Sequence, residues 1–82
     1  MMKPVPIPLA KIYVPQKFKG TLEPAKMEAL ADDIVQNGLQ IPIQVRVDKD
    51  RYVLVAGLHR LEAFRFLGEA AIPALVVAAR KF

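Results

Sequence analysis

The residues best suited to chemistry lie within residues 53–63, where an apolar segment meets a glycine and then two adjacent basic side chains. A helix that begins after Gly57 would present backbone N–H groups without partners and the positive end of its macrodipole. His59 and Arg60 would add side-chain donors at the same place. This arrangement predicts a binding site for a phosphate or another anion.

Composition limits the kinds of protein this chain can form. Its 82 residues are enough for one domain with a modest core, and we expect residues 1–82 to form it. Zero cysteines and a single histidine exclude disulfides, thiol nucleophiles and zinc cages, so we expect no resident metal. The apolar runs are too short to cross a bilayer and no signal-peptide pattern occurs, which predicts a cytoplasmic protein without membrane contact.

Hydrophobic periodicity predicts the elements that position the glycine and the basic pair. We expect helices at residues 24–36 and 58–67, and strands at residues 9–14, 43–47, 52–56 and 72–77. Thr21 or Glu23 would cap the first helix, and glycines at 38 and 68 would end the two helices. The last strand can pair only if Pro73 faces away from the ladder or lies at an edge. This order predicts an α+β domain with both helices packed on one sheet.

A helical wheel of the second helix places its charged residues on different sides. The polar face holds Glu62, Arg65 and Glu69, together with Leu58. His59 and Arg60 fall within the apolar arc, whose other members we expect in the core: Leu61, Ala63, Phe64, Phe66 and Leu67. Cations that point inward need a partner, because burial of an unpaired charge is costly.

Two interpretations of this inward pair stay open from the residues alone. In the first, His59 and Arg60 bind an anion. In the second, Arg60 pairs with Asp32 or Asp33 and His59 donates to a backbone carbonyl, which forms an internal network without a ligand. Leu58 would contact a base or a partner in the first case, or the amino-terminal arm near Ile7 or Tyr13.

The wider pattern around the glycine is similar to a known superfamily. Residues 38–43 (GLQIPI) and 52–63 (YVLVAGLHRLEA), with Gly68, resemble the amino-terminal nucleotide-binding domain of ParB-like proteins and the related sulfiredoxins. The resemblance covers almost the whole chain and implies their small α+β fold, a mixed sheet with two main helices. ParB proteins read Gly-Glu-Arg-Arg at this helix start and sulfiredoxins read Gly-Cys-His-Arg, so Gly57-Leu58-His59-Arg60 is nearer to the sulfiredoxin form.

The resemblance also implies a ligand and the residues that bind it. It extends to residues 22–26 and 72–74, and it implies that Lys26, His59 and Arg60 contact the phosphates of a nucleotide (ATP or CTP, with or without Mg²⁺), beside Gly57 and Leu58. Leu58 replaces the catalytic cysteine of sulfiredoxins, which excludes reduction of sulfinic acid by their mechanism. Two hydroxyl positions of the phosphate site hold Ala29 and Asp33 instead, and Asp33 would repel a phosphate unless Mg²⁺ lay between them.

Three classes of function follow. The favoured class is a nucleotide- or phosphate-binding regulatory or interaction module, related to plasmid and chromosome partition proteins. The second is an enzyme on the same scaffold (a phosphotransferase, NTP hydrolase or nuclease), for which Asp33, Glu62 and Glu28 are the nearby acids. The third is weak, non-specific binding of DNA by the basic arm, which carries Lys3, Lys11, Lys17 and Lys19. A small core that leaves apolar surface also favours a homodimer.

Overall fold

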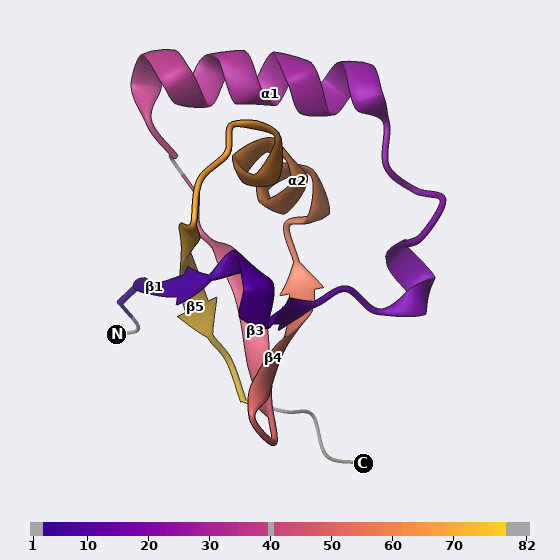
Figure 1. The fold of residues 1–82 in the computed structure, drawn as a ribbon, viewed down its shortest axis with the longest axis vertical. Helices are drawn as coiled ribbons and strands as arrows, with labels where there is room; N and C mark the ends of the chain where they lie inside the picture. Colours follow the sequence, from indigo (N-terminus) through magenta and orange to yellow (C-terminus); the bar gives the residue numbers. More distant parts are fainter. Residues whose placement is uncertain (1–2, 40, 79–82) are drawn as a thin grey trace.

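A computed structural model describes residues 3–39 and 41–78 of the chain (Figure 1). At its centre lies a hairpin of β3 (Ile43–Asp48) and β4 (Arg51–Ala56), which pair antiparallel. Ile43 and Val45 alternate with exposed or half-buried polar residues, as expected for a strand with one buried face. The turn is tight, because Asp48 pairs directly with Arg51 and Lys49 adopts a φ of 58°.

Three further strands complete a mixed five-stranded sheet in the described residues, with the order β1-β5-β3-β4-β2. These strands are β1 (Val5–Pro8), β2 (Ile12–Tyr13) and β5 (Ala71–Val76). The β1–β5 and β3–β4 pairs are antiparallel, whereas β3–β5 and β2–β4 are parallel. The predicted mixed sheet is therefore confirmed.

Both helices lie on one side of this sheet, in two layers (Figure 1). The helix α2 (Leu58–Phe66) packs between the sheet and α1 (Pro24–Asn37). The larger core cluster includes Leu54, Leu58 and Leu61, and a smaller one joins the helices through Ala31, Ile34 and Ala63. The α+β fold is confirmed, and no helix in the described residues is long and apolar enough to span a bilayer.

The single strand expected at residues 9–14 is confirmed only at Ile12–Tyr13 and is wrong for the residues before it. Leu9–Lys11 forms a 3₁₀ turn, and the strands on either side of it belong to opposite edges of the sheet. One continuous strand cannot occupy both edges, so the chain must turn between them. Leu9 anchors this turn, because its side chain is buried and its N–H donates to the carbonyl oxygen of Ala70 at 2.9 Å.

Pro73 lies inside the sheet rather than at its edge, because β5 has neighbours on both sides. It stands opposite Pro6 of β1, and the pairing with β3 begins one residue later, at Ala74. Neither proline has an N–H to donate, so the two face each other where the antiparallel ladder takes no hydrogen bond. The last strand can therefore pair although it contains Pro73, because the proline is not required to donate a hydrogen bond to the ladder.

The single apolar arc predicted for the second helix is wrong at two positions. The wheel places Leu58 on the polar face, but its side chain is only 9% exposed, and it places Phe66 in the core, but this residue is 60% exposed. The cause is the layering, because a helix between a sheet and another helix is covered on two sides. Glycines end both helices as expected, since Gly38 and Gly68 adopt φ values of 77° and 76°.

Candidate functional site

The amino termini of the two helices open onto one hollow of about 440 Å³. Lys26 stands in the first turn of α1, and Gly57 to Arg60 form the start of α2. All five residues predicted for phosphate binding line this hollow: Gly57, Leu58, His59, Arg60 and Lys26. The fold thus brings together residues that are more than thirty positions apart in the chain.

Gly57 is required by the backbone of the junction itself. Its φ of 106° lies in the left-handed region, and a Cβ atom built there would stand 2.7 Å from Cγ2 of Ile43. The carbonyl of Gly57 accepts the first helical hydrogen bond of α2, from the N–H of Leu61 at 2.9 Å. The N–H groups of Leu58, His59 and Arg60 therefore have no helical acceptors, and they lie at the amino end of α2, beside the hollow.

His59 links the two helix starts. Its Nε2 accepts a hydrogen bond from the backbone N–H of Glu23 at 3.0 Å, which assigns the ring proton to Nδ1. Among the described residues no carbonyl accepts a hydrogen bond from His59, so the expected donation to a carbonyl is wrong. Glu23 holds the N-cap position of α1, where no helical carbonyl accepts from its N–H, so that N–H is available to the imidazole. The other predicted cap, Thr21, donates its hydroxyl to the carbonyl oxygen of Phe18 instead, at 2.6 Å.

Replacement of His59 by alanine is expected to lower the free energy of unfolding by about 1 kcal/mol, the usual net contribution of one hydrogen bond. The Glu23 N–H would lose its acceptor, and the tie between the helix starts would be lost. Urea denaturation monitored by circular dichroism measures the change. Lys26→Ala is the matched control, because Lys26 lines the same hollow without a hydrogen bond in the described residues. Equal stabilities of the two variants would show that the link contributes nothing.

Arg60 is held by backbone carbonyls. Its Nη1 donates to the oxygens of Ile41 at 3.1 Å and Pro42 at 3.3 Å, so the expected pairing with Asp32 or Asp33 is wrong. These carbonyls follow the end of α1 and lie beside the start of α2, where they orient the guanidinium. In the described residues, its other N–H groups have no acceptor. Arg60 therefore keeps donors for a ligand.

The acids considered for catalysis do not line the hollow. Asp33 accepts a hydrogen bond from Nδ2 of Asn37 at 2.9 Å, and it lies ~10 Å beyond Lys26 along α1. Glu62 pairs with Arg65 at 3.5 Å, and Glu28 is exposed on α1. Among the described residues, no three acidic, histidine or cysteine side chains are placed to hold a metal ion. Among the described residues, the titratable side chains that line the hollow are therefore those of Lys26, His59 and Arg60.

Three lining residues were missed by the sequence analysis: Phe18, Thr21 and Leu30. Leu30 stands one helical turn after Lys26, so the spacing of α1 could have identified it. Phe18 belongs to the 3₁₀ turn η2 (Gln16–Phe18), and it reaches the hollow only because the loop before α1 folds back. No local pattern signals that loop. Together, Phe18 and Leu30 give the hollow an apolar side.

The basic arm does not contribute to this hollow. Lys3, Lys11, Lys17 and Lys19 are all exposed, and none of them lines it. Lys17 instead lines a separate hollow on the sheet. Binding of nucleic acid by these lysines stays a prediction.

The amino-acid sequence of residues 4–81 matches the family described as the ParB N-terminal domain. The chain belongs to this family. Among curated proteins, the ParB-like domain is 39% identical to the chloroplastic/mitochondrial sulfiredoxin of Arabidopsis thaliana over 64 residues. That match covers 78% of the chain but only 51% of the relative, so the chain spans about half the length of this sulfiredoxin.

Solved structures share the same fold. The crystal structure of the Arabidopsis thaliana sulfiredoxin matches with a TM-score of 0.83 and 34% identity, over 96% of this chain and 86% of that one. The truncated partition protein ParB of Caulobacter crescentus, complexed with CTP-γ-S, matches with a TM-score of 0.80 and 26% identity, over 95% and 46%. A mutant free serine kinase in complex with AMP matches with a TM-score of 0.77 over 92% of this chain and 31% of that one, and its 24% identity shows the fold alone.

Leu58 occupies the position at which this ParB-like domain differs from the sulfiredoxin pattern. The resemblance places it where sulfiredoxins have their catalytic cysteine, and leucine has no group that can act as a nucleophile. Its side chain belongs to the larger core cluster together with Ile7, whereas Tyr13 is 42% exposed. Of the two roles considered for Leu58, packing near the amino-terminal arm is the one that its burial supports.

Proposed function

We propose that this ParB-like domain binds a nucleotide at the hollow between the starts of α1 and α2. The observation that carries the proposal is the convergence of two helix amino termini with Lys26, His59 and Arg60 around one hollow, which no acid of the described residues lines. Each helix start contributes partial positive charge and N–H groups, which suit phosphate oxygens. The basic side chains add charge at the same place.

The hollow also has room and surface for the rest of a nucleotide. Its volume of about 440 Å³ falls within the range of ~300–1,000 Å³ that is usual for small-molecule sites. Phe18 and Leu30 supply an apolar wall against which a base can pack, while the phosphates contact the basic side. A base and a phosphate chain together complement the hollow better than a bare phosphate does.

ATP and CTP are the ligands we propose first. Structural relatives were solved as complexes with CTP-γ-S, with AMP and with ADP, and the first of these is a ParB protein. Any Mg²⁺ would be held mainly by the phosphates, because the described lining residues offer no carboxylate.

A thermal-shift screen with ATP, ADP, CTP and GTP, each with and without Mg²⁺, tests the proposal. A ligand that binds only the folded state stabilises it by about 2.7 kcal/mol at 100 times its Kd. That stabilisation corresponds to an increase of roughly 10–20 °C in Tm for a domain of this size. A Tm that none of the nucleotides raises, confirmed by calorimetry, would contradict nucleotide binding.

Lys26→Gln is expected to weaken nucleotide binding about threefold to tenfold, since one partly screened cation near the phosphates is lost. Lys49→Gln removes the same charge at the exposed hairpin turn and serves as the control. Isothermal titration calorimetry with the nucleotide that the screen selects measures both variants. If both weaken binding equally, only net charge matters and Lys26 does not contact the ligand.

We propose a binding module rather than an enzyme, in which occupancy of the hollow changes a contact with a partner. The absence of acids from the described lining supports this choice. Product analysis of the same nucleotide mixtures distinguishes the module from a hydrolase or a phosphotransferase, because either enzyme would release a new nucleotide species with time. Degradation of single-stranded and duplex DNA tests the nuclease alternative.

A further inference from the structure

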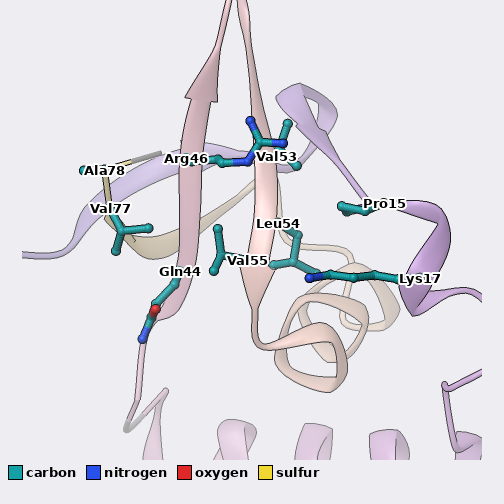
Figure 2. A pocket seen from close by; sticks show the side chains of 9 residues that line it. All are labelled: Pro15, Lys17, Gln44, Arg46, Val53, Leu54, Val55, Val77 and Ala78. Carbon is teal, nitrogen blue, oxygen red and sulfur yellow. The ribbon is translucent and has the colours of Figure 1, made fainter. Parts of the chain in front are cut away.

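The sheet face opposite the helices carries a second hollow, of about 780 Å³ (Figure 2). Gln44 and Arg46 line it and alternate along β3 with Ile43 and Val45, whose side chains lie in the core. The hollow shares no lining residue with the nucleotide site, although Lys17 on this side is followed by Phe18 on the other.

The lining of this hollow combines an apolar floor with cations. Val53 and Val55 of β4 and Val77 supply the apolar surface, while Arg46 and Lys17 supply the charge. All nine lining residues belong to the described part of the chain, and none of them is acidic. The volume is typical of sites for small molecules.

Among residues 3–39 and 41–78, neither cation has an acidic partner. Arg46 is half-buried, and no hydrogen bond or ion pair engages its guanidinium among the described residues, whereas Arg51 and Arg65 each pair with a carboxylate. The Lys17 ammonium lies 5.3 Å from the centroid of the Phe18 ring, and within residues 3–39 and 41–78 it has no hydrogen bond or ion pair. Figure 2 shows Arg46 extending across the sheet toward Val53, and Lys17 reaching from η2 toward Leu54 and Val55.

We propose that this hollow binds a small aliphatic carboxylate. The planar guanidinium of Arg46 matches the two oxygens of a carboxylate, and Lys17 adds positive charge to the same hollow. The hydrocarbon chain of the ligand covers the valines. An inorganic anion would leave this apolar floor in water, and a neutral chain would leave the half-buried guanidinium without a counter-charge.

Titration of octanoate into ¹⁵N-labelled protein, followed by NMR, tests the proposal. We expect saturable shifts at the amides of Arg46, Val53 and Val55, and weaker binding of hexanoate and acetate. Each methylene removed weakens binding roughly twofold to fourfold while the chain contacts the valines. Octanol, which has the same chain without the charge, binds about tenfold more weakly than octanoate.

Arg46→Gln is expected to weaken octanoate binding about tenfold, and Arg46→Lys to weaken it less. Lys49→Gln removes one positive charge outside the hollow and leaves octanoate binding unchanged. Thermal unfolding of each variant confirms that it is folded. Equal affinities for octanol and octanoate, unchanged binding by Arg46→Gln, or shifts confined to residues 57–60 would overturn the proposal. None of these results depends on nucleotide binding, so the two proposals fail separately.

Discussion

Replacement of Arg60 by glutamine is expected to weaken nucleotide binding roughly 10- to 100-fold, because a charge-assisted hydrogen bond contributes about 1.5–3 kcal/mol. The guanidinium is oriented by the carbonyls of Ile41 and Pro42 and lines the hollow beside the start of α2. Glutamine keeps a donor but loses the charge that complements a phosphate. Isothermal titration calorimetry with ATP and CTP measures the change.

Arg60 also contributes to stability, so the binding measurement needs two controls. Loss of its bonds to the carbonyls is expected to lower the free energy of unfolding by about 1–2 kcal/mol, and the titration is done at a temperature where the variant is folded. Arg65→Gln removes the same charge farther along α2, where the side chain pairs with Glu62 away from the hollow. If the Arg60→Gln variant binds nucleotide as tightly as the Arg65→Gln variant does, Arg60 does not contact the nucleotide.

Replacement of Gly57 by alanine is expected to lower the free energy of unfolding by about 2–4 kcal/mol. The positive φ of 106° accounts for roughly 1–2 kcal/mol, and the approach of the new Cβ to 2.7 Å from Cγ2 of Ile43 adds about 1–2 kcal/mol. For a domain of this size, each kcal/mol lowers Tm by about 4–8 °C. Chemical denaturation measures the loss.

Gly68→Ala separates the two causes. Gly68 also has a positive φ, of 76°, but a Cβ atom there would meet nothing within 4 Å. Gly68→Ala is therefore expected to lower the free energy of unfolding only by the conformational cost of the positive φ, about 1 kcal/mol. If Gly57→Ala destabilised the protein no more than Gly68→Ala does, the close approach to Ile43 would have no energetic consequence.

The local elements of this fold could be predicted from the sequence. The alternation along residues 43–47, the turn before Arg51 and the glycines after both helices act over a few residues, and their predictions are confirmed within one or two positions. The amino-terminal strand could not be predicted, because its division depends on pairing with strands far along the chain. Val5 pairs with Ala74, and Ile12 pairs with Tyr52.

In the candidate site, too, local patterns could be predicted from the sequence and contacts between distant segments could not. The strand-glycine-helix pattern and the resemblance predicted Gly57, Leu58, His59, Arg60 and Lys26, and the fold gathers these five residues around one hollow. The hydrogen-bond partners of His59 and Arg60 could not be predicted, because they are backbone groups, which nearly every residue carries whatever its side chain. Glu23 reaches His59 through its N–H, and Ile41 and Pro42 reach Arg60 through their carbonyls, only after α1 has packed on α2.

NMR mapping of nucleotide binding on the wild-type protein tests the central claim most directly. Titration of ATP or CTP, with and without Mg²⁺, into ¹⁵N-labelled protein is expected to give saturable shifts at the amides of Gly57, Leu58, His59, Arg60 and Lys26. Amides that line the sheet hollow, such as Val53 and Val55, are expected to shift little. The claim is contradicted if no nucleotide gives saturable shifts. It is equally contradicted if the shifts follow Lys3, Lys11, Lys17 and Lys19 and disappear at moderate salt, as simple phosphate attraction would.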